Sequence, residues 1–269
     1  MLLWQVERFR NCVPIRWSRV PLVRTKDKVS GLRIDLSIDN KQGCANSVWL
    51  TYCANSSKRV RSLIVLFKWF CSQHGLTGCG LGDHFSGYYL VLMAVFFLQT
   101  RGILSSVHAL QRGQECLLLD GWNYALNNKA SMYQDISEAP VTQLLLKLFK
   151  FYASFNYSEK IIRPLEGVAI SKRTLEDPTK LPVSLQTDKF QALKPKDLIN
   201  LTEKPVVVQD PFELSRNTSL SVSVDKRQQF VEKCEGAVNI LEKVLLKESG
   251  CYLWMIFEQS FLTFCSVQC

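Results

Sequence analysis

Apolar residues recur at helical spacing in several stretches of the chain. The first stretch predicts an amphipathic helix that ends near Gly75. Its apolar side chains stand three or four residues apart and are Val60, Leu63, Ile64, Phe67, Phe70 and Cys71. The second stretch runs from about Ser86 to Gln99 and is apolar almost all round. A helix without a polar face belongs inside a fold, so we expect this one to be central.

Two further helices are predicted in the second half of the chain. They cover residues 141–155, with the sequence VTQLLLKLFKFYASF, and residues 227–248. Between them, residues 157–209 hold five of the nine prolines and two short strand candidates, 161–170 and 205–210. This composition predicts a segment that is irregular and partly exposed.

The N-terminal residues have the shorter period of strands. Residues 16–24 and 32–38 are predicted strands, joined by a polar turn with the sequence KDKVSG. Strands followed by helices indicate an α+β protein. The last 19 residues, 251–269, are apolar without a clean period. They fit either a packed terminal helix or the product of an unusual transcript end.

Charge and composition narrow the class of protein. The chain has 269 residues, of which 33 are Lys or Arg and 24 are Asp or Glu, so its net charge is +9. This excess favours a polyanionic partner. A hydrophobic content of 47% excludes disorder over the whole length. The longest apolar run, Tyr88–Leu98, is too short to span a membrane. Charged residues at positions 7, 8 and 10 interrupt any signal peptide, so we expect an intracellular protein without a membrane partner.

The ten cysteines are scattered and include no CxxC pair. We therefore expect reduced thiols rather than disulfides or a structural metal site. His74, His84 and His108 are isolated from one another, and none is assigned a chemical role.

Four blocks of sequence together resemble a known family. In chain order they are GLRIDLSIDNKQGCANSVWL, RVRSLIVLFKWFCSQHGL, HFSGYYLVLMAVFFLQTRG and VVVQDPFELSRN. Their order over about 200 residues is similar to that of the DNA polymerase β-like RNA terminal nucleotidyltransferases, which include non-templated poly(A) polymerases and terminal uridylyltransferases. The segments GLTG, FLQTRGIL and DGWNY are most similar to a nuclear subfamily that tails a small nuclear RNA.

The resemblance implies a domain organisation. Residues 1–43 would be part of a nucleotidyltransferase domain, and residues 44–250 a helical central domain. The central domain would include the poly(A)-polymerase-associated region at about 141–217. Residues 251–269 would form an apolar tail.

The resemblance also implies a catalytic metal site. Family members hold two magnesium or manganese ions with three carboxylates, and the ions stabilise the attacking and leaving oxygens of nucleotidyl transfer. Asp35 matches the third carboxylate, whereas no D-x-D pair stands upstream of it. We therefore predict that this chain alone is inactive, or that the activity belongs to a longer parent protein. Taken without the family, Asp35 is interpreted as a capping or salt-bridged residue.

The residues of the family's nucleotide pocket are better matched. By resemblance, Asn46 and Ser47 contact the ribose, Lys68 the triphosphate of UTP or ATP, and Tyr88 the base, while Asn40 is a weaker candidate for the base edge. Alternatives are a helix N-cap for Asn46, a solvated position for Lys68 and core packing for Tyr88.

Two positions of this pocket depart from the family. Ser86 is followed by Gly87, where many members carry a second Ser, and Ser72 stands where a second Lys is common. Both departures predict a lower affinity for the triphosphate.

Base choice is assigned by resemblance to the loop with Asp210, Glu213 and Arg216. Uridine-preferring relatives usually have His at the position of Arg216. Arg216 is able to read a carbonyl edge or to pair with Asp210 or Glu213. The alternative for this segment is a helix start with Asp210 as cap and Phe212 as a hydrophobic staple.

A basic strip near the N-terminus completes the predicted site. Its proposed RNA-binding residues are Arg16, Arg19, Arg24 and Lys28, and the alternative is a solvated charged edge. The predicted function is template-independent addition of uridylates or adenylates to the 3′ end of a small nuclear or messenger RNA. The alternatives are an inactive nucleotide- or RNA-binding pseudo-enzyme and an unstable fragment with unpaired strand edges. Nuclear localisation follows from the resemblance, with the cytoplasm as alternative, and the oligomeric state stays open.

Overall fold

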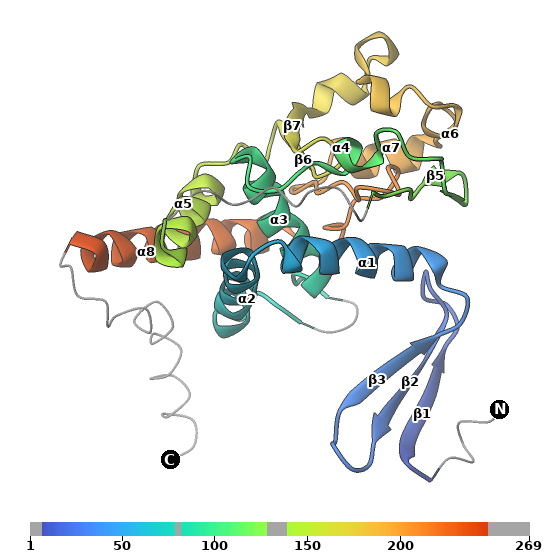
Figure 1. The fold of residues 1–269 in the computed structure, drawn as a ribbon, viewed down its shortest axis with the longest axis horizontal. Coiled ribbons are helices and arrows are strands. Elements are labelled where there is room, and N and C mark those ends of the chain that lie inside the picture. Colours follow the sequence, from blue (N-terminus) through green and yellow to red (C-terminus); the bar gives the residue numbers. More distant parts are fainter. Residues whose placement is uncertain (1–6, 79–81, 128–138, 247–269) are drawn as a thin grey trace. The chain divides into compact units, whose positions relative to one another are not determined.

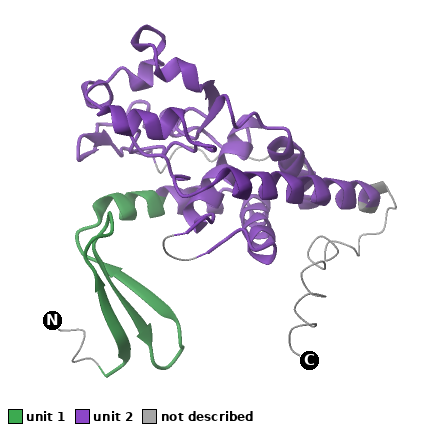
Figure 2. Ribbon diagram, turned by 180° about the vertical axis from the view of Figure 1, so that it is seen from behind, with its two compact units in different colours: residues 1–48 green, residues 49–269 purple. Residues whose placement is uncertain are grey.

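The computed structural model describes residues 7–78, 82–127 and 139–246 (Figure 1). The chain divides into two compact units, residues 1–48 and residues 49–269, which are coloured green and purple in Figure 2. Unit 1 contains a sheet, and unit 2 is mainly helical with short strands. The predicted α+β class is confirmed. The predicted tail at 251–269 lies outside the described residues.

The described residues of unit 1 form a three-stranded antiparallel sheet of order β1-β2-β3 (Figure 1). Its strands are β1 (Phe9–Ile15), β2 (Leu22–Asp27) and β3 (Arg33–Ser37). The strand predicted at 32–38 is confirmed as β3. The one predicted at 16–24 is wrong in its first part, because residues 16–21 are a turn in which the Ser18 hydroxyl donates to the Ile15 carbonyl.

β1 lies outside the predicted strands. A bulge between Arg10 and Val13 shifts its pairing with β2, and Asn11 within this bulge has a left-handed φ of 55°. One extra residue breaks the alternation of side chains on which a strand prediction rests.

Helix α1 (Lys41–Asn55) follows the sheet, and Asn40 directly precedes the helix. The Asn40 side-chain oxygen accepts the N–H of Gly43 at 2.9 Å, which is the hydrogen bond of an N-cap. The alternative that made Asn46 the cap is wrong, since Asn46 lies within the helix. The cap falls six positions earlier because strand β3 ends at Ser37 and leaves only a short connection.

The amphipathic stretch around residues 60–71 forms α2 (Lys58–Gln73), as predicted. The hydroxyl of its cap, Ser57, accepts the N–H of Val60 at 3.2 Å. Gly75 ends the helix region with a positive φ of 65°, a conformation that glycine adopts without strain. The apolar stretch forms α3 (Gly87–Thr100), in which Leu90 and residues 92–99 are buried. Its predicted central position is confirmed.

The third and fourth predicted helices are α5 (Val141–Ala153) and α8 (Val224–Leu246). They pack against each other and against α2 around Phe67. The ring of Phe67 lies 6.3 Å from that of Phe149 and 6.2 Å from those of Tyr152 and Phe230. Tyr152 also donates its hydroxyl to the Met93 carbonyl of α3 at 2.6 Å, which ties the central helix to this aromatic core.

Short elements fill the remainder of the described part of unit 2. They are α4 (Val107–Gln111), β4 (Leu118–Leu119), β5 (Trp122–Asn123), β6 (Lys160–Arg163), β7 (Val168–Ser171), η2 (Lys172–Leu175), η3 (Pro178–Lys180), η4 (Val183–Leu185), α6 (Asp188–Gln191) and α7 (Pro195–Thr202).

The two strand candidates of this region need correction. The first, 161–170, is a hairpin of β6 and β7 rather than one strand, because the chain reverses at Gly167, which has a φ of 70°. The second, 205–210, makes only isolated bridges, between Ile162 and Val208 and between Gln209 and Asn217.

The cysteines that the structure describes are free thiols, as expected from the sequence: Cys12, Cys44, Cys53, Cys71, Cys116 and Cys234. Burial raises the pKa of the Cys53 thiol to about 12, so it stays protonated at neutral pH. No helix within the described ranges has the length and apolarity needed to cross a bilayer.

The aromatic core predicts a large effect of one substitution. Phe67→Ala removes a fully buried ring that contacts α5 and α8, so the free energy of unfolding should fall by about 3–5 kcal/mol. Val65→Ala on the same helix is the matched control, because Val65 is 57% exposed. Urea unfolding followed by circular dichroism measures both. Similar losses for the two variants would contradict this packing.

Candidate functional site

Asp35, the predicted catalytic and metal-binding residue, lies in β3 directly opposite Arg24 of β2. Arg24 donates to both carboxylate oxygens, from Nε to Oδ1 at 2.8 Å and from Nη2 to Oδ2 at 2.7 Å. These hydrogen bonds hold the pKa of the Asp35 carboxyl below its ordinary value. The salt-bridged alternative left open by the sequence is therefore the state found in the structure.

The described residues do not by themselves fit the metal cage that the family resemblance implies. Among them, no group of three or more His, Cys, Asp or Glu side chains is arranged to hold an ion. An ion at Asp35 would also have to displace Arg24 from both oxygens. The metal role of Asp35 stays a prediction.

The ribose and base-edge candidates of unit 1 lie at the start of α1. The Ser47 hydroxyl donates to the Gly43 carbonyl at 2.8 Å. The side-chain amide oxygen of Asn40 already accepts the N–H of Gly43 in the helix cap. The side-chain oxygen of Asn46 is buried and has no hydrogen-bond partner among the described residues. Asn46 is thus the candidate of this group with an unused acceptor.

The four basic residues predicted to bind RNA are not gathered in one patch. Arg16 and Arg19 are exposed in the turn before β2, whereas Lys28 is exposed in the turn after it. These turns lie at opposite ends of a six-residue strand, which is about 20 Å long. Arg24 lies between them and is paired with Asp35. Their RNA contacts stay a prediction.

In unit 2, the structure brings together three predicted residues from distant parts of the sequence. Tyr88 in the first turn of α3 donates its hydroxyl to Asp210 Oδ2 at 3.1 Å, across 122 positions of sequence. Arg216 donates from Nη1 to the same oxygen at 3.2 Å. The Arg216 guanidinium carbon also lies 5.6 Å from the centre of the Tyr88 ring, which is a cation–π geometry.

Burial shapes the electrostatics of this cluster. Asp210 is 1% exposed, whereas the Arg216 side chain is 31% exposed. Desolvation, and next the charge of Asp210, raise the pKa of Tyr88 well above its ordinary value. The phenol therefore stays protonated at physiological pH and acts as a hydrogen-bond donor.

Asp210 organises a turn rather than a helix. Its Oδ1 accepts the N–H groups of Phe212 at 3.0 Å and of Glu213 at 3.1 Å, but no helix starts here. Phe212 does not act as a helix staple, because its ring stacks on Tyr124 at 4.8 Å. The helix alternative for this segment is wrong. We call residues 210–216 the Asp210 loop.

The predicted phosphate-binding residues lie close to the start of α3. Ser86 is the cap of this helix, and its hydroxyl accepts the N–H of Tyr89 at 3.1 Å. Lys68 is exposed on α2, and its Nζ lies 3.8 Å from where a Cβ on Gly87 would stand. The ammonium group and the positive end of the helix dipole together favour an anion at this place.

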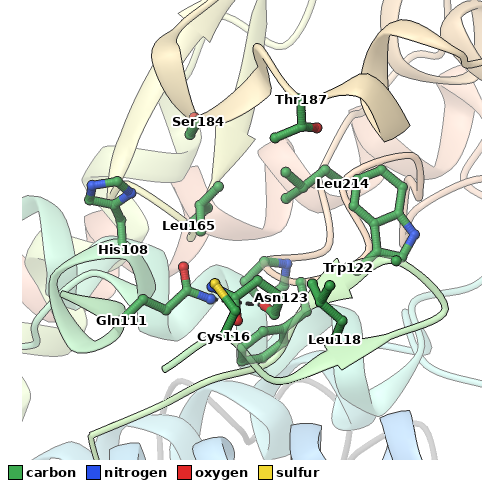
Figure 3. A pocket seen from close by; sticks show the side chains of 13 residues that line it. His108, Gln111, Cys116, Leu118, Trp122, Asn123, Leu165, Ser184, Thr187 and Leu214 are labelled. Atoms are coloured by element: carbon green, nitrogen blue, oxygen red, sulfur yellow. Dashed lines mark hydrogen bonds between the residues drawn. The ribbon is translucent and has the colours of Figure 1, made fainter. Parts of the chain in front are cut away.

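A pocket beside the Asp210 loop was not predicted from the sequence (Figure 3). Its volume is about 300 Å³, and it is lined by segments far apart in sequence, including Trp122, Leu165, Thr187 and Leu214. Phe212 and Leu214 bring the loop into its wall. The DGWNY segment supplies Trp122 and Asn123, but no sequence pattern indicates that these segments meet.

Two protein-family models match this chain, in two separate segments. A family described as "Cid1 family poly A polymerase" matches residues 140–216. A family described as "Poly(A) RNA polymerase, mitochondrial-like, central palm domain" matches residues 1–55. Both matches are to models of poly(A) polymerase families, which confirms the resemblance drawn from the sequence.

Curated relatives have the same character. The speckle targeted PIP5K1A-regulated poly(A) polymerase of Xenopus tropicalis is 28% identical over 246 residues, which cover 86% of this chain and 27% of the relative. The Homo sapiens protein of that name is 28% identical over 245 residues. Poly(A) RNA polymerase GLD2-A of Xenopus laevis is 34% identical over 162 residues, or 58% of this chain. The chain spans about a quarter of the length of the speckle targeted relatives it matches.

Solved structures share the fold. A crystal structure of mtPAP in complex with UTP superposes with a TM-score of 0.73 at 20% identity and covers 90% of this chain and 47% of that one. The Cid1 poly(U) polymerase superposes with a TM-score of 0.69 at 18% identity and covers 95% of this chain and 74% of that one.

The Arg24 to Asp35 pair predicts a shifted titration. Because the pKa of Asp35 is lowered in the folded protein, the pair stabilises the fold above the ordinary carboxyl pKa and loses this contribution as pH falls through the folded pKa. Arg24→Gln should return the pKa toward the ordinary value. Carbon-13 NMR of the Asp35 side chain measures it.

Arg33→Gln is the control for net charge, since the Arg33 charge contributes less to the shift than Arg24 does. It should raise the pKa of Asp35 by a smaller amount. Equal shifts in the two variants would mean that general charge, not the bidentate contact, sets the titration.

Proposed function

We propose that this chain, which matches two poly(A) polymerase family models, is the nucleotide-recognition part of an RNA 3′-terminal nucleotidyltransferase. The observation that carries the proposal is the cluster of Tyr88, Asp210 and Arg216, with Lys68 next to the start of the same helix. The reaction class is template-independent addition of uridylate or adenylate to RNA. The mtPAP and Cid1 structures support the class through their shared fold.

In this proposal, the ring of Tyr88 stacks on the base of the nucleoside triphosphate. Its hydroxyl is fixed by Asp210, and the Arg216 guanidinium carbon lies 5.6 Å from the ring centre, next to the place proposed for the base. Lys68 and the start of α3 bind the triphosphate, and Asn46 with Ser47 contacts the ribose. Asn40 is a weaker contact to the base edge, because its side-chain amide oxygen already caps α1.

Arg216 is proposed to favour uridine. A guanidinium carries only hydrogen-bond donors, and one of them is used by Asp210. The remaining donors match a base edge with carbonyl oxygens, as in uracil, better than the adenine edge, which has none. This assignment of the base rests on Arg216 alone.

The alternative function is a nucleotide- or RNA-binding pseudo-enzyme. The bidentate pairing of Asp35 with Arg24 favours it, as does the lack of a three-ligand metal group within the described part of the chain. In that case the nucleotide cluster is retained without the transfer step. Both functions predict that the chain binds a nucleotide, and only the transferase predicts that RNA is extended.

The proposed cellular location and RNA substrate are inferred from the relatives of this chain. Their name includes the words "speckle targeted", which supports a nuclear location, and a small nuclear or messenger RNA is the proposed substrate. Imaging of the tagged full chain tests the location against the cytoplasmic alternative. Basic residues at positions 16, 19, 24 and 28 are proposed to contact the RNA phosphates.

Extension of labelled RNA distinguishes the enzyme from the pseudo-enzyme. We expect the chain alone not to add nucleotides with any of the four triphosphates and magnesium or manganese, because two carboxylates of the implied metal site are lacking upstream of Asp35. Extension by the chain that is abolished in Asp35→Ala would establish the enzyme, while extension that survives this change would refute the role of Asp35.

Nucleotide binding tests the cluster independently of catalysis. Tyr88→Ala should weaken UTP binding by about 1–3 kcal/mol because the stacking surface is lost. Tyr88→Phe keeps the ring and removes only the bond to Asp210, so its loss should be smaller. Isothermal titration calorimetry measures both. Unchanged UTP affinity in Tyr88→Ala, with the fold intact by circular dichroism, would assign the ring to core packing.

A further inference from the structure

We propose that Gln209 is a positioning residue for base selection, oriented by the buried Arg163. It acts by fixing the Asp210 loop, which carries Arg216 next to Tyr88. The inference rests on the proposed function for its link to nucleotide choice. It assigns a role to two residues that neither touch Tyr88 nor belong to the cluster itself.

Arg163 is the anchor of this arrangement. It is the last residue of β6 and is 0% exposed, which requires that its charge be neutralised inside the protein. Its Nη1 lies 2.5 Å from Glu166 Oε2, and its Nη2 donates to the Ser184 hydroxyl at 3.1 Å. The third nitrogen, Nε, donates to Gln209 Oε1 at 2.7 Å. Of these three partners, Gln209 directly precedes the loop in the sequence, whereas Glu166 and Ser184 belong to other segments of the chain.

Gln209 passes this orientation on to the loop. A guanidinium can only donate, so it selects the carbonyl end of the Gln209 amide and turns the NH2 group the opposite way. That group donates to the Leu214 carbonyl at 2.6 Å. The backbone of Gln209 is fixed as well, because its N–H donates to the Ile162 carbonyl of β6 at 3.0 Å. Gln209 is 1% exposed, so water does not compete for these bonds.

The Leu214 carbonyl is an effective point at which to hold the loop. The loop closes on itself through the N–H of Arg216 to the Glu213 carbonyl and the N–H of Asp210 to the Arg216 carbonyl, both at 2.9 Å. A shift at Leu214 therefore moves Arg216. The side chain of Leu214 borders the pocket of about 300 Å³ shown in Figure 3. Packing is incomplete on that side, so the polar bond from Gln209 carries more of the restraint.

The experiment uses three single variants of the full chain. Gln209→Glu keeps an acceptor for Arg163 but, when ionised beside it, cannot donate to Leu214. Gln209→Met removes both bonds with a side chain of similar length. Ser184→Ala is the matched control, because it removes the hydroxyl that accepts from Arg163 and donates to Glu166, and leaves the bond from Gln209 to Leu214 in place.

Three measurements are made on each variant. Hydrogen exchange of the Asp210 and Arg216 amides reports loop order without any nucleotide. Titration with UTP and with ATP gives both Kd values and their ratio. Urea unfolding gives the free energy of unfolding. If Gln209 had only a structural role, its variants would change this quantity and neither the loop exchange nor the ratio of Kd values.

Both Gln209 variants should raise exchange at the two amides and raise the Kd for UTP by about fivefold, the size expected for one lost hydrogen bond. They should also bring the UTP and ATP constants closer together. Ser184→Ala should lower stability while exchange and the ratio of constants stay within about twofold. If Gln209→Met does not fold, Gln209→Glu against Ser184→Ala decides alone.

The contrary outcomes are distinct. Unchanged loop exchange and an unchanged ratio in the Gln209 variants would overturn the positioning role. Equal effects from Ser184→Ala would overturn it too, by reducing Gln209 to a general contribution to stability. If the unaltered chain binds neither nucleotide, the proposed function fails, while hydrogen exchange still decides whether Gln209 orders the loop.

Discussion

A buried carboxylate needs hydrogen-bond donors around it, and Asp210 is buried at 1% exposure. Its two oxygens accept from four groups: the N–H groups of Phe212 and Glu213, the Tyr88 hydroxyl and Arg216. The first two fold the loop, and the last two bring the aromatic ring and the guanidinium together. The chain therefore satisfies one buried charge and builds a candidate base site with the same contacts.

The same logic extends behind the loop. Arg163 is a second fully buried charge, and its donors reach Glu166, Ser184 and Gln209. The two buried charges, Arg163 and Asp210, have opposite sign. They are connected because Gln209, which Arg163 holds, directly precedes Asp210 in the sequence. Each fixes one side of the Asp210 loop, Asp210 from the side of Tyr88 and Arg163 from the side of β6. A loop held at both sides by desolvated hydrogen bonds loses few degrees of freedom when a ligand binds.

The sequence predicted the helices well because their stability comes from apolar faces that repeat every three or four residues. Strand β1 was not predictable in this way, since its bulge at Asn11 interrupts the alternation. Asn40 and Asn46 are both chemically suitable helix caps, and only the end of β3 decides between them. The pairing of Asp35 with Arg24 depends on the register of two strands, which composition does not fix. Similarly, the contacts of Gln209 need a fold that joins residues 163, 209 and 214.

The departures from the family pattern also gain a physical meaning. A Cβ on Gly87 would stand 3.8 Å from Lys68 Nζ, which is an ordinary contact distance, so the lack of a second Ser is not imposed by crowding. A hydroxyl at that position would point into the neighbourhood of the ammonium group and offer a further donor to a phosphate. Without it, the proposed phosphate site consists of Lys68, Ser86 and the first amides of α3. The proposed base end of the site is thus held by a network of buried hydrogen bonds, whereas the only charged side chain of the proposed phosphate end is the exposed Lys68. Recognition by this chain should accordingly rest more on the base than on the triphosphate.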